Sequence, residues 1–377
     1  MTKKISFILL FLLFFSCKQS EKNTKQSSIE NQPNLYAKHF RFIKFKSFGL
    51  LKIINAYPGA PGYTYVLMPR KYKNKLPDSL KKYPVINIPV NRIVVTSTTH
   101  LPALEILKVG DKLTGFPHLQ YISSEYFIKR IKEGKITEVG NAQQLNTELI
   151  LKLQPGLVMT FNSGNDASGE NKYLTKNGIP VMLNADWMEQ NPLGRAEWIK
   201  VFGYLFQKEK SADSIFQLIE KNYKEIQKKI SNKQTKPLVF QGGIFGDKWF
   251  VPGGKSYAAQ LIKDAGGIYL WNDNNNNGSI RLNFENALMK LPQTDIWLNP
   301  GVYENKQQLS KDIPAVKNLT CYKNNKIYTY NLTKGKTGGV LYFEYSNIHP
   351  DWILNDLFHI FYPQNDAYQF HFYQELP

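Results

Sequence analysis

The sequence contains little cysteine and little arginine, and each shortage excludes a class of function. Its 377 residues include two cysteines, Cys17 and Cys321, too few for a disulfide-rich scaffold or a cysteine-only zinc site. The net charge of +18 comes mainly from lysine, because only six of the 48 basic residues are arginine. Proteins that read DNA sequence usually place arginine side chains on base edges. We therefore expect no nucleic-acid partner, and the positive charge favours anionic ligands or surfaces.

Signatures of catalysis and of metal binding are missing or incomplete. The chain has neither a Gly-x-Ser-x-Gly nor a His-Glu-x-x-His motif. Gly253–Ser256 resembles part of a phosphate loop, but Trp249 stands where that loop needs its first glycine. Asp273–Gly278 resembles a calcium loop, but its twelfth position is Phe284 instead of glutamate. The histidines have no compact metal-site spacing. We expect a protein that is not an enzyme and holds no metal or cofactor.

The first residues have the layout of an export signal. Lys3 and Lys4 precede an apolar run, Ile5–Phe15, which is followed closely by Cys17. About eleven apolar residues are too few to cross a hydrocarbon core of ~30 Å, but they suit a cleaved signal. The pattern resembles a bacterial lipoprotein signal, residues 1–16, followed by a lipidated cysteine. An ordinary secreted protein with a free cysteine is the alternative.

A tether and a β-rich extension are expected to follow the signal. Residues 17–40 comprise the cysteine and a flexible tether, since Lys18–Gln32 is too polar to fold. Residues 41–90 alternate like strands around the turn Pro58–Gly62, which predicts a β-hairpin. The β-branched run Arg92–Thr96 is typical of a buried parallel strand and begins a first α/β lobe.

An internal repeat predicts two lobes of similar construction. One copy runs from Asn146 to Met159 and the other from Asn283 to Leu298. In each, asparagine can cap a short helix and a glutamate, Glu148 or Glu285, stands in its first turn. A proline follows each glutamate after seven residues and ends the helix before a strand.

A long amphipathic helix is predicted between the two copies. Over Ser211–Lys233, apolar residues recur at helical spacing without an interior glycine or proline. We expect a first lobe over 91–194, a linker with this stiff helix over 195–236, and a second lobe over 237–377. The fold class is therefore α/β, with two lobes, one rigid connecting helix and a ligand cleft between the lobes. A surface helix within a single domain is the alternative interpretation of the long segment.

These features together resemble one family. They are the lipoprotein signal, Ser97-Thr98-Thr99-His100 after the first strand, the repeat, the long helix, and Pro252-Gly253-Gly254-Lys255-Ser256 with Ala265-Gly266-Gly267. The chain resembles the helix-linked substrate-binding proteins of ABC importers over about residues 90–365. The resemblance implies a monomeric protein, lipid-anchored in the periplasm, that captures a ferric siderophore or another iron chelate. Cobalamin or haem is the alternative ligand, and a surface enzyme or a structural adhesion lipoprotein represents a different class of function.

The resemblance also implies a partner and a way to contact it. In such importers a glutamate on each lobe is thought to pair with arginines of the permease, which works with its ATPase. Glu148 and Glu285 stand at these positions, and the repeat independently places both on equivalent helix starts. A stiff helix would hold the two carboxylates at a fixed spacing. The alternative is that each glutamate only stabilises its own helix dipole.

The ligand site is expected at the carboxyl ends of the strands, where two-lobed open sheets form their crevice. Hydroxyl and aromatic residues on the loops there suit oxygen-rich and flat chelates, although each aromatic could equally be a core residue. Arg281 could bind a carboxylate or lie on solvated surface. The predicted ligand-binding residues are Ser97, Thr98, Thr99, His100, Tyr121, Phe161, Asn162, Trp187, Trp249, Phe250, Arg281, Tyr342, Phe343 and Glu344.

Overall fold

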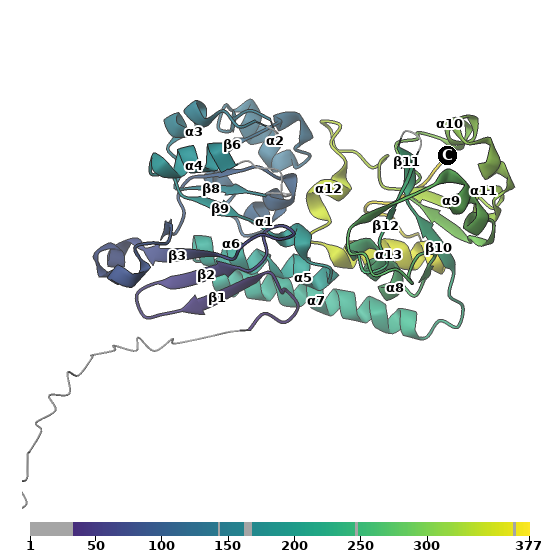
Figure 1. The fold of residues 1–377 in the computed structure, drawn as a ribbon, viewed down its shortest axis with the longest axis horizontal. Coiled ribbons are helices and arrows are strands. Elements are labelled where there is room, and N and C mark those ends of the chain that lie inside the picture. The colour runs from purple at the N-terminus through teal and green to yellow at the C-terminus, as the bar shows by residue number, and fades with distance from the viewer. Residues whose placement is uncertain (1–32, 142–143, 162–167, 246–247, 365–366) are drawn as a thin grey trace, which may run out of the picture.

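The computed structural model describes residues 33–141, 144–161, 168–245, 248–364 and 367–377. Two α/β lobes lie side by side above one long helix, and a smaller sheet packs beneath the first lobe (Figure 1). The expected two-lobed α/β fold is confirmed. Among the described residues, no helix has both the length and the apolar character needed to cross a membrane.

The first lobe is built on a parallel sheet of five strands in the order β7-β6-β5-β8-β9. Its central strand, β5 (Ile93–Val95), is buried at every position, as its β-branched run predicts. The other strands are β6 (Leu113–Phe116), β7 (Thr137–Glu138), β8 (Leu157–Thr160) and β9 (Val181–Leu183). The helices are α1 (Leu101–Ile106), α2 (Glu125–Lys132), α3 (Thr147–Leu153) and α4 (Ser168–Lys176).

The second lobe repeats this arrangement in the order β13-β10-β15-β16-β17, with only β17 antiparallel. Its strands are β10 (Leu238–Gln241), β13 (Ile268–Tyr269), β15 (Ile296–Leu298), β16 (Ile327–Thr329) and β17 (Gln374–Glu375). A three-stranded sheet is added by β11 (Gly243–Phe245), β12 (Lys248–Pro252) and β14 (Ser279–Leu282). The helices are α8 (Tyr257–Asp264), α9 (Phe284–Lys290), α10 (Lys306–Asp312), α11 (Thr320–Lys323), α12 (Leu341–Tyr345) and α13 (Pro350–Phe361).

The sequence repeat occupies the same place in both sheets. In the first lobe the capped helix α3 leads into β8, which pairs in parallel with the lobe's first strand, β5. In the second lobe α9 leads into β15, which pairs in parallel with β10, again the first strand. Asn146 accepts a hydrogen bond from Leu149 N–H as the predicted helix cap. Asn283 stands at the N-cap of α9 without a side-chain cap bond.

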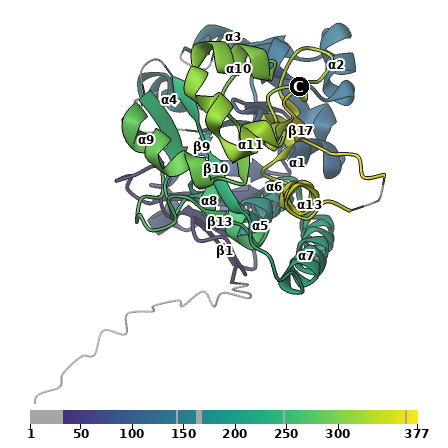
Figure 2. The same ribbon diagram turned by 90° about the vertical axis from the view of Figure 1, so that its right-hand side faces the viewer.

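The connecting helix is α7 (Glu209–Ser231), close to the predicted range. Its 23 residues make a rod of roughly 35 Å. Its buried stripe contains Ala212, Phe216, Ile219, Tyr223, Ile226 and Ile230. Leu218, another apolar residue of the predicted segment, lies outside this stripe and is 59% exposed. The stripe packs against α6 (Ile199–Phe206) and α13, and α13 lies beside α7 when the molecule is turned (Figure 2). The helix therefore contacts elements from both halves of the chain.

The extension is a four-stranded sheet that contains the predicted hairpin, since its second and third strands pair antiparallel on either side of the turn at Pro58–Gly62. Its order is β1 (Phe40–Lys44), β2 (Gly49–Ile53), β3 (Tyr63–Pro69) and β4 (Val85–Ile88), with β4 parallel to β3. One face buries Phe40, Leu51 and Ile53 in the main core. The other face has its own small apolar cluster around Phe48, Val66 and Met68. Because one apolar face of the sheet is buried in the main core, the extension packs on the first lobe instead of standing free.

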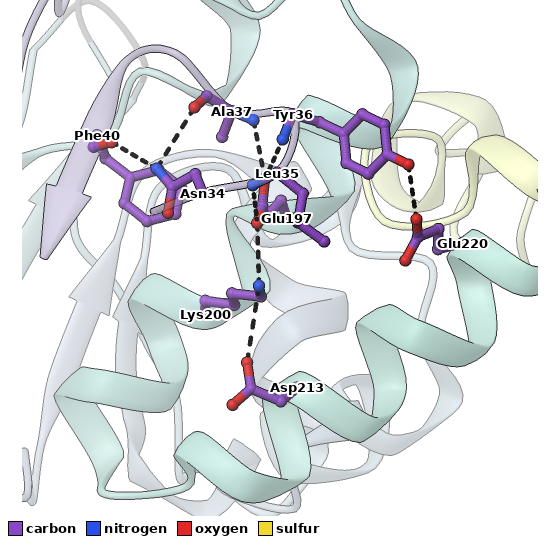
Figure 3. Close-up of polar contacts among 9 residues, drawn as sticks. All are labelled: Asn34, Leu35, Tyr36, Ala37, Phe40, Glu197, Lys200, Asp213 and Glu220. Carbon is purple, nitrogen blue, oxygen red and sulfur yellow. Dashed lines mark hydrogen bonds and ion pairs between the residues drawn. The ribbon is translucent and has the colours of Figure 1, made fainter. Parts of the chain in front are cut away.

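The segment before β1 is fixed to the body, which corrects the prediction of a flexible tether up to residue 40. The backbone N–H groups of Leu35, Tyr36 and Ala37 donate to the carboxylate of Glu197 at 2.8–2.9 Å (Figure 3). Glu197 belongs to α5 (Pro192–Glu197) and is completely buried. Its carboxylate also pairs with Lys200 at 2.9 Å.

A second buried carboxylate continues this attachment. Lys38 and His39 donate their backbone N–H groups to Glu189 at 2.8–3.0 Å. The indole N–H of Trp198 also donates to Glu189, at 3.2 Å. The carboxylates of Glu189, just before α5, and of Glu197, at the end of α5, thus accept five consecutive backbone N–H groups of the N-terminal segment.

Candidate functional site

Two cavities lie between the lobes. The larger, about 550 Å³, is lined by Pro58 of the extension, by Trp187, Met188, Gln190 and Arg195, and by second-lobe residues that include Gln241, Phe250, Tyr257, Asn299, Tyr330 and Asn331. The smaller, about 320 Å³, is lined by Thr96, Ser97, Thr98, Phe116, Pro117, His118, Tyr121 and Phe161 of the first lobe and by Gly339, Val340 and Phe343 of the second. Both volumes fall in the range of small-molecule sites, and each cavity draws on both halves of the chain.

A second-lobe segment around α12 reaches across and packs on the first lobe, where Figure 1 shows it between the two sheets. Thr337 Oγ1 donates to Ile122 O at 2.7 Å, and Ser123 Oγ donates to Gly339 O at 3.1 Å. A Cβ added to Gly339 would lie 2.6 Å from Tyr121 O, so only glycine permits this approach. The segment therefore forms a wall of the smaller cavity and holds the lobes together in this conformation.

Glu344 of α12 makes a buried polar contact between the lobes. Its carboxylate accepts hydrogen bonds from the backbone N–H groups of Ser123 (2.6 Å) and Ser124 (3.0 Å), and the residue is 1% exposed. Burial raises the pKa of Glu344 to about 7; the nearby Glu105 adds to the rise, while the two N–H groups oppose it. Tyr345 also lies in this cluster, and burial raises the pKa of its hydroxyl.

We expect the packing between the lobes to weaken as the pH rises through about 7. The pKa of Glu344 in the folded protein lies above the ordinary value of 4.5, so its stabilisation is complete below pH 4.5 and is lost through pH 7. Between pH 5.5 and 8.5, thermal unfolding should show a loss of roughly 2 kcal/mol that Glu344→Gln lacks. Glu125→Gln, at an exposed position nearby, should keep the wild-type profile. Identical profiles for wild type and Glu344→Gln would contradict the prediction.

Several predicted ligand-binding residues come together at these cavities. Ser97, Thr98, Tyr121, Phe161 and Phe343 line the smaller one. Thr98 Oγ1 donates to Phe343 O at 3.2 Å across the lobe boundary. The three aromatic side chains are 40–55% exposed, which leaves their rings available to a ligand. Two further predicted residues, Trp187 and Phe250, line the larger cavity.

The remaining predicted residues lie elsewhere or serve the packing. The guanidinium of Arg281 lies 5.4 Å from the centroid of the Phe250 ring on the neighbouring strand, and Arg281 lines neither cavity. Thr99 bonds to Ser97 through its hydroxyl and its N–H without lining either cavity. Tyr342 stacks on Tyr330 with ring centroids 4.0 Å apart. Asn162 lies outside the described residues.

Three residues predicted to contact ligand are instead buried. His100 is fully buried beside Phe202, and burial lowers the pKa of its imidazole to about 4. Trp249 is fully buried and packs its ring against Phe240 and Trp297. Glu344 is occupied by its hydrogen bonds to the first lobe. In this conformation none of the three offers surface to a ligand.

Sequence reasoning missed Arg195 as a cleft residue. Its guanidinium lies 3.6 Å from the centroid of the Tyr257 ring and donates to Asn347 Oδ1 at 3.2 Å. It also donates to the carbonyls of Glu189 and Trp187, which hold it in place. Arg195 thus presents a fixed positive charge at the larger cavity. No local motif marks this role.

The other cavity residues that the sequence analysis missed lie at the ends of strands. Gln241 ends β10 and Asn299 follows β15, so both amides stand at the carboxyl end of the second-lobe sheet. His118 follows β6 in a left-handed conformation (φ 54°) and lies 5.2 Å from the Tyr121 ring. The same strand-end rule could have identified all three residues. Among the described residues, no group of three or more His, Cys, Asp or Glu is placed to hold a metal ion.

Glu148 and Glu285 occupy equivalent places in the two lobes. Each is exposed in the first turn of its helix, α3 or α9. Those helices precede equivalent strands of the two sheets, as described above. The two carboxylates are therefore available to an external partner, one from each lobe.

Comparison with known proteins gives the family. Residues 93–332 match the sequence profile of the family described as periplasmic binding protein. The chain belongs to this family. The periplasmic binding protein is 26% identical over 360 residues to an uncharacterized lipoprotein of Methanocaldococcus jannaschii, covering 88% of this chain and 85% of that protein.

Solved structures share the fold of this periplasmic binding protein. A possible iron-binding periplasmic solute-binding protein from Staphylococcus epidermidis matches with a TM-score of 0.58 and 20% identity, over 73% of this chain and 99% of its own. The periplasmic haem-binding protein HutB of Vibrio cholerae matches with a TM-score of 0.57 and 14% identity, over 72% of this chain and 100% of its own. At these identities the likeness shows the fold alone.

Proposed function

We propose that this periplasmic binding protein captures a ferric siderophore or a similar iron chelate and delivers it to an ABC permease with its ATPase. The observation that carries the proposal is the larger cavity, which both lobes line and in which Arg195 presents a fixed charge beside Trp187 and Phe250. Aromatic faces suit flat chelating groups, and a guanidinium pairs with their anionic oxygens. We assign no catalytic step to this site.

The proposal includes a lipid anchor at Cys17 and a periplasmic location. The support is the signal-like segment before Cys17 and the M. jannaschii relative, which is named a lipoprotein. The protein would act as a monomer that reaches the membrane through this anchor, with Glu148 and Glu285 as its contacts to the permease. It needs no cofactor of its own.

Haem is the second candidate ligand, because one observation favours it over cobalamin. His118 and Tyr121 lie together at the smaller cavity with Phe161 and Phe343. Imidazole and phenolate are both groups that bind haem iron, and the two phenylalanine rings offer flat apolar surface. The smaller cavity would have to open further to admit a porphyrin.

We expect ferric siderophore to quench tryptophan fluorescence at micromolar concentration, because Trp187 lines the larger cavity. Arg195→Ala should weaken this binding at least tenfold through loss of a charged hydrogen-bonding partner. Arg92→Ala is the matched control, because Arg92 is exposed and lines neither cavity, and this variant should bind normally. Haemin and cobalamin are titrated in parallel. Binding of haemin alone, with absorption changes lost in His118→Ala, would instead support the second candidate.

A further inference from the structure

The extension holds a disproportionate share of the positive charge. Residues 41–90 contain eight lysines and two arginines but only one acidic residue, Asp78. These fifty residues therefore contribute +9, half of the net charge of +18 of the whole chain. A concentration of one sign on one small sheet produces a local potential that scattered surface lysines do not.

The basic side chains of the extension point to solvent. Every described one is exposed: Arg41, Lys44, Lys46, Lys52, Arg70, Lys71, Lys81 and Lys82. Among the described residues, the one ion pair that they make is Lys81 with Asp78, at 2.6 Å. Arg41 on β1 lies directly opposite Lys52 on β2. Like charges in this cross-strand position are destabilising unless an anion lies nearby, so the surface favours an anionic partner.

The attachment of the N-terminal segment places the tether beside this surface. Glu197 and Glu189 hold residues 35–39 by their backbone. Figure 3 shows the Glu197 contacts together with Asn34, whose Nδ2 donates to Phe40 O at the start of β1. Sixteen residues, 17–32, precede the described chain. Even fully extended they reach roughly 55 Å. A lipid at Cys17 would therefore keep the extension, the first sheet that the structure describes, within that distance of the bilayer.

We propose that the extension is a cationic surface that binds the anionic lipid headgroups of the membrane. The proposal rests on the lipid anchor proposed above, which brings the extension near the membrane. The surface itself consists of exposed side chains on the strands of the extension and on the turns between them. Basic clusters near a bilayer gain affinity from each lysine or arginine, and a lipid chain and a basic patch together anchor more firmly than either alone. The combination would hold the body against the membrane in one orientation instead of leaving it free on its tether.

Vesicle sedimentation tests this surface without lipid anchor, ligand or permease. The probe is the chain from residue 17 with Cys17→Ser, mixed with vesicles of phosphatidylcholine alone or with 30% phosphatidylglycerol. We expect at least tenfold tighter binding to the anionic vesicles at 50 mM NaCl, and loss of that preference at 500 mM. Equal affinity for the two vesicle types, or a preference unaffected by salt, would overturn the proposal.

A pair of matched variants locates the contact. Replacing four exposed extension residues, Lys44, Lys46, Lys52 and Lys82, by glutamine should weaken anionic-vesicle binding at least tenfold. The control replaces four exposed lysines of the second lobe, Lys255, Lys311, Lys317 and Lys323, by glutamine and should change it less than twofold. Equal losses would show that total charge, not the extension, is responsible. Binding to soluble heparin without binding to vesicles would also overturn the proposal, in favour of a soluble polyanion.

Discussion

Replacing Glu148 and Glu285 together by glutamine is expected to reduce ligand uptake at least tenfold while leaving ligand affinity unchanged. Both carboxylates are exposed, one on each lobe, and both stand in the first turn of helices that occupy equivalent places in the two sheets. Glutamine keeps the size and the helix start but removes the charge that permease arginines would meet. Uptake of labelled ferric siderophore by cells, with fluorescence titration of the purified variant, measures the two quantities separately.

Each single variant should retain part of the activity, because charged pairs at the edge of an interface contribute modestly on their own. The matched control replaces Glu133 and Glu304, exposed residues of the first and second lobes, by glutamine. It removes the same charge without touching the repeated helix starts, and uptake should stay normal. Normal uptake by the Glu148/Glu285 variant would eliminate the docking proposal without affecting the proposed ligand.

The repeat and the long helix could be predicted because their signals are local. An asparagine cap, a glutamate in the first turn and a proline seven residues later define α3 and α9 within a few residues. Periodic apolar residues locate α7 to within two residues at each end. The two-lobed fold could therefore be predicted from the sequence. The pairing of each repeat's strand with the first strand of its sheet was not predicted and comes from the structure.

The direction of a side chain was harder to predict than its place in the chain. Trp249 and Phe250 are neighbours on β12, so they must face opposite sides of the sheet. Phe250 lines the larger cavity, whereas Trp249 enters the core between Phe240 and Trp297. Alternation predicts that only one of the two reaches the cleft, but it does not show which. His100 was misplaced for a similar reason, since its loop is near the cleft while its ring points into the core.

Contacts between distant segments had no signal in the sequence. Glu344 meets Ser123 and Ser124 across more than 200 residues. Glu197 binds the backbone of residues 35–37 across about 160 residues. Almost every residue type has a backbone N–H group, so the sequence does not indicate which ones a carboxylate will bind. From the sequence, Glu344 was assigned to the ligand site and no role was assigned to Glu197. Only the fold shows that each is buried with its hydrogen bonds made by another part of the chain.

Glu197→Gln is expected to lower the free energy of unfolding by about 3 kcal/mol. The buried carboxylate accepts from the N–H groups of Leu35, Tyr36 and Ala37 and pairs with Lys200 (Figure 3). A glutamine amide has one acceptor oxygen, so its NH₂ group would face a backbone donor and Lys200 would lose its nearest anion. Breaking a buried, hydrogen-bonded charge in this way is costly because the remaining partners stay desolvated. Urea unfolding followed by tryptophan fluorescence measures the change, with Trp198 next to the substitution.

Glu225→Gln provides the matched comparison, because Glu225 is exposed on α7 and lies 3.9 Å from Lys221. An exposed pair of this kind contributes little, so that variant should unfold within about 0.5 kcal/mol of the wild type. The Glu197 variant should also lose protection from proteases first at residues 33–40, since these are the residues that the carboxylate holds. If both variants were equally stable, the carboxylate would not be what attaches the N-terminal segment, and Glu189 with its bonds to Lys38 and His39 would have to suffice.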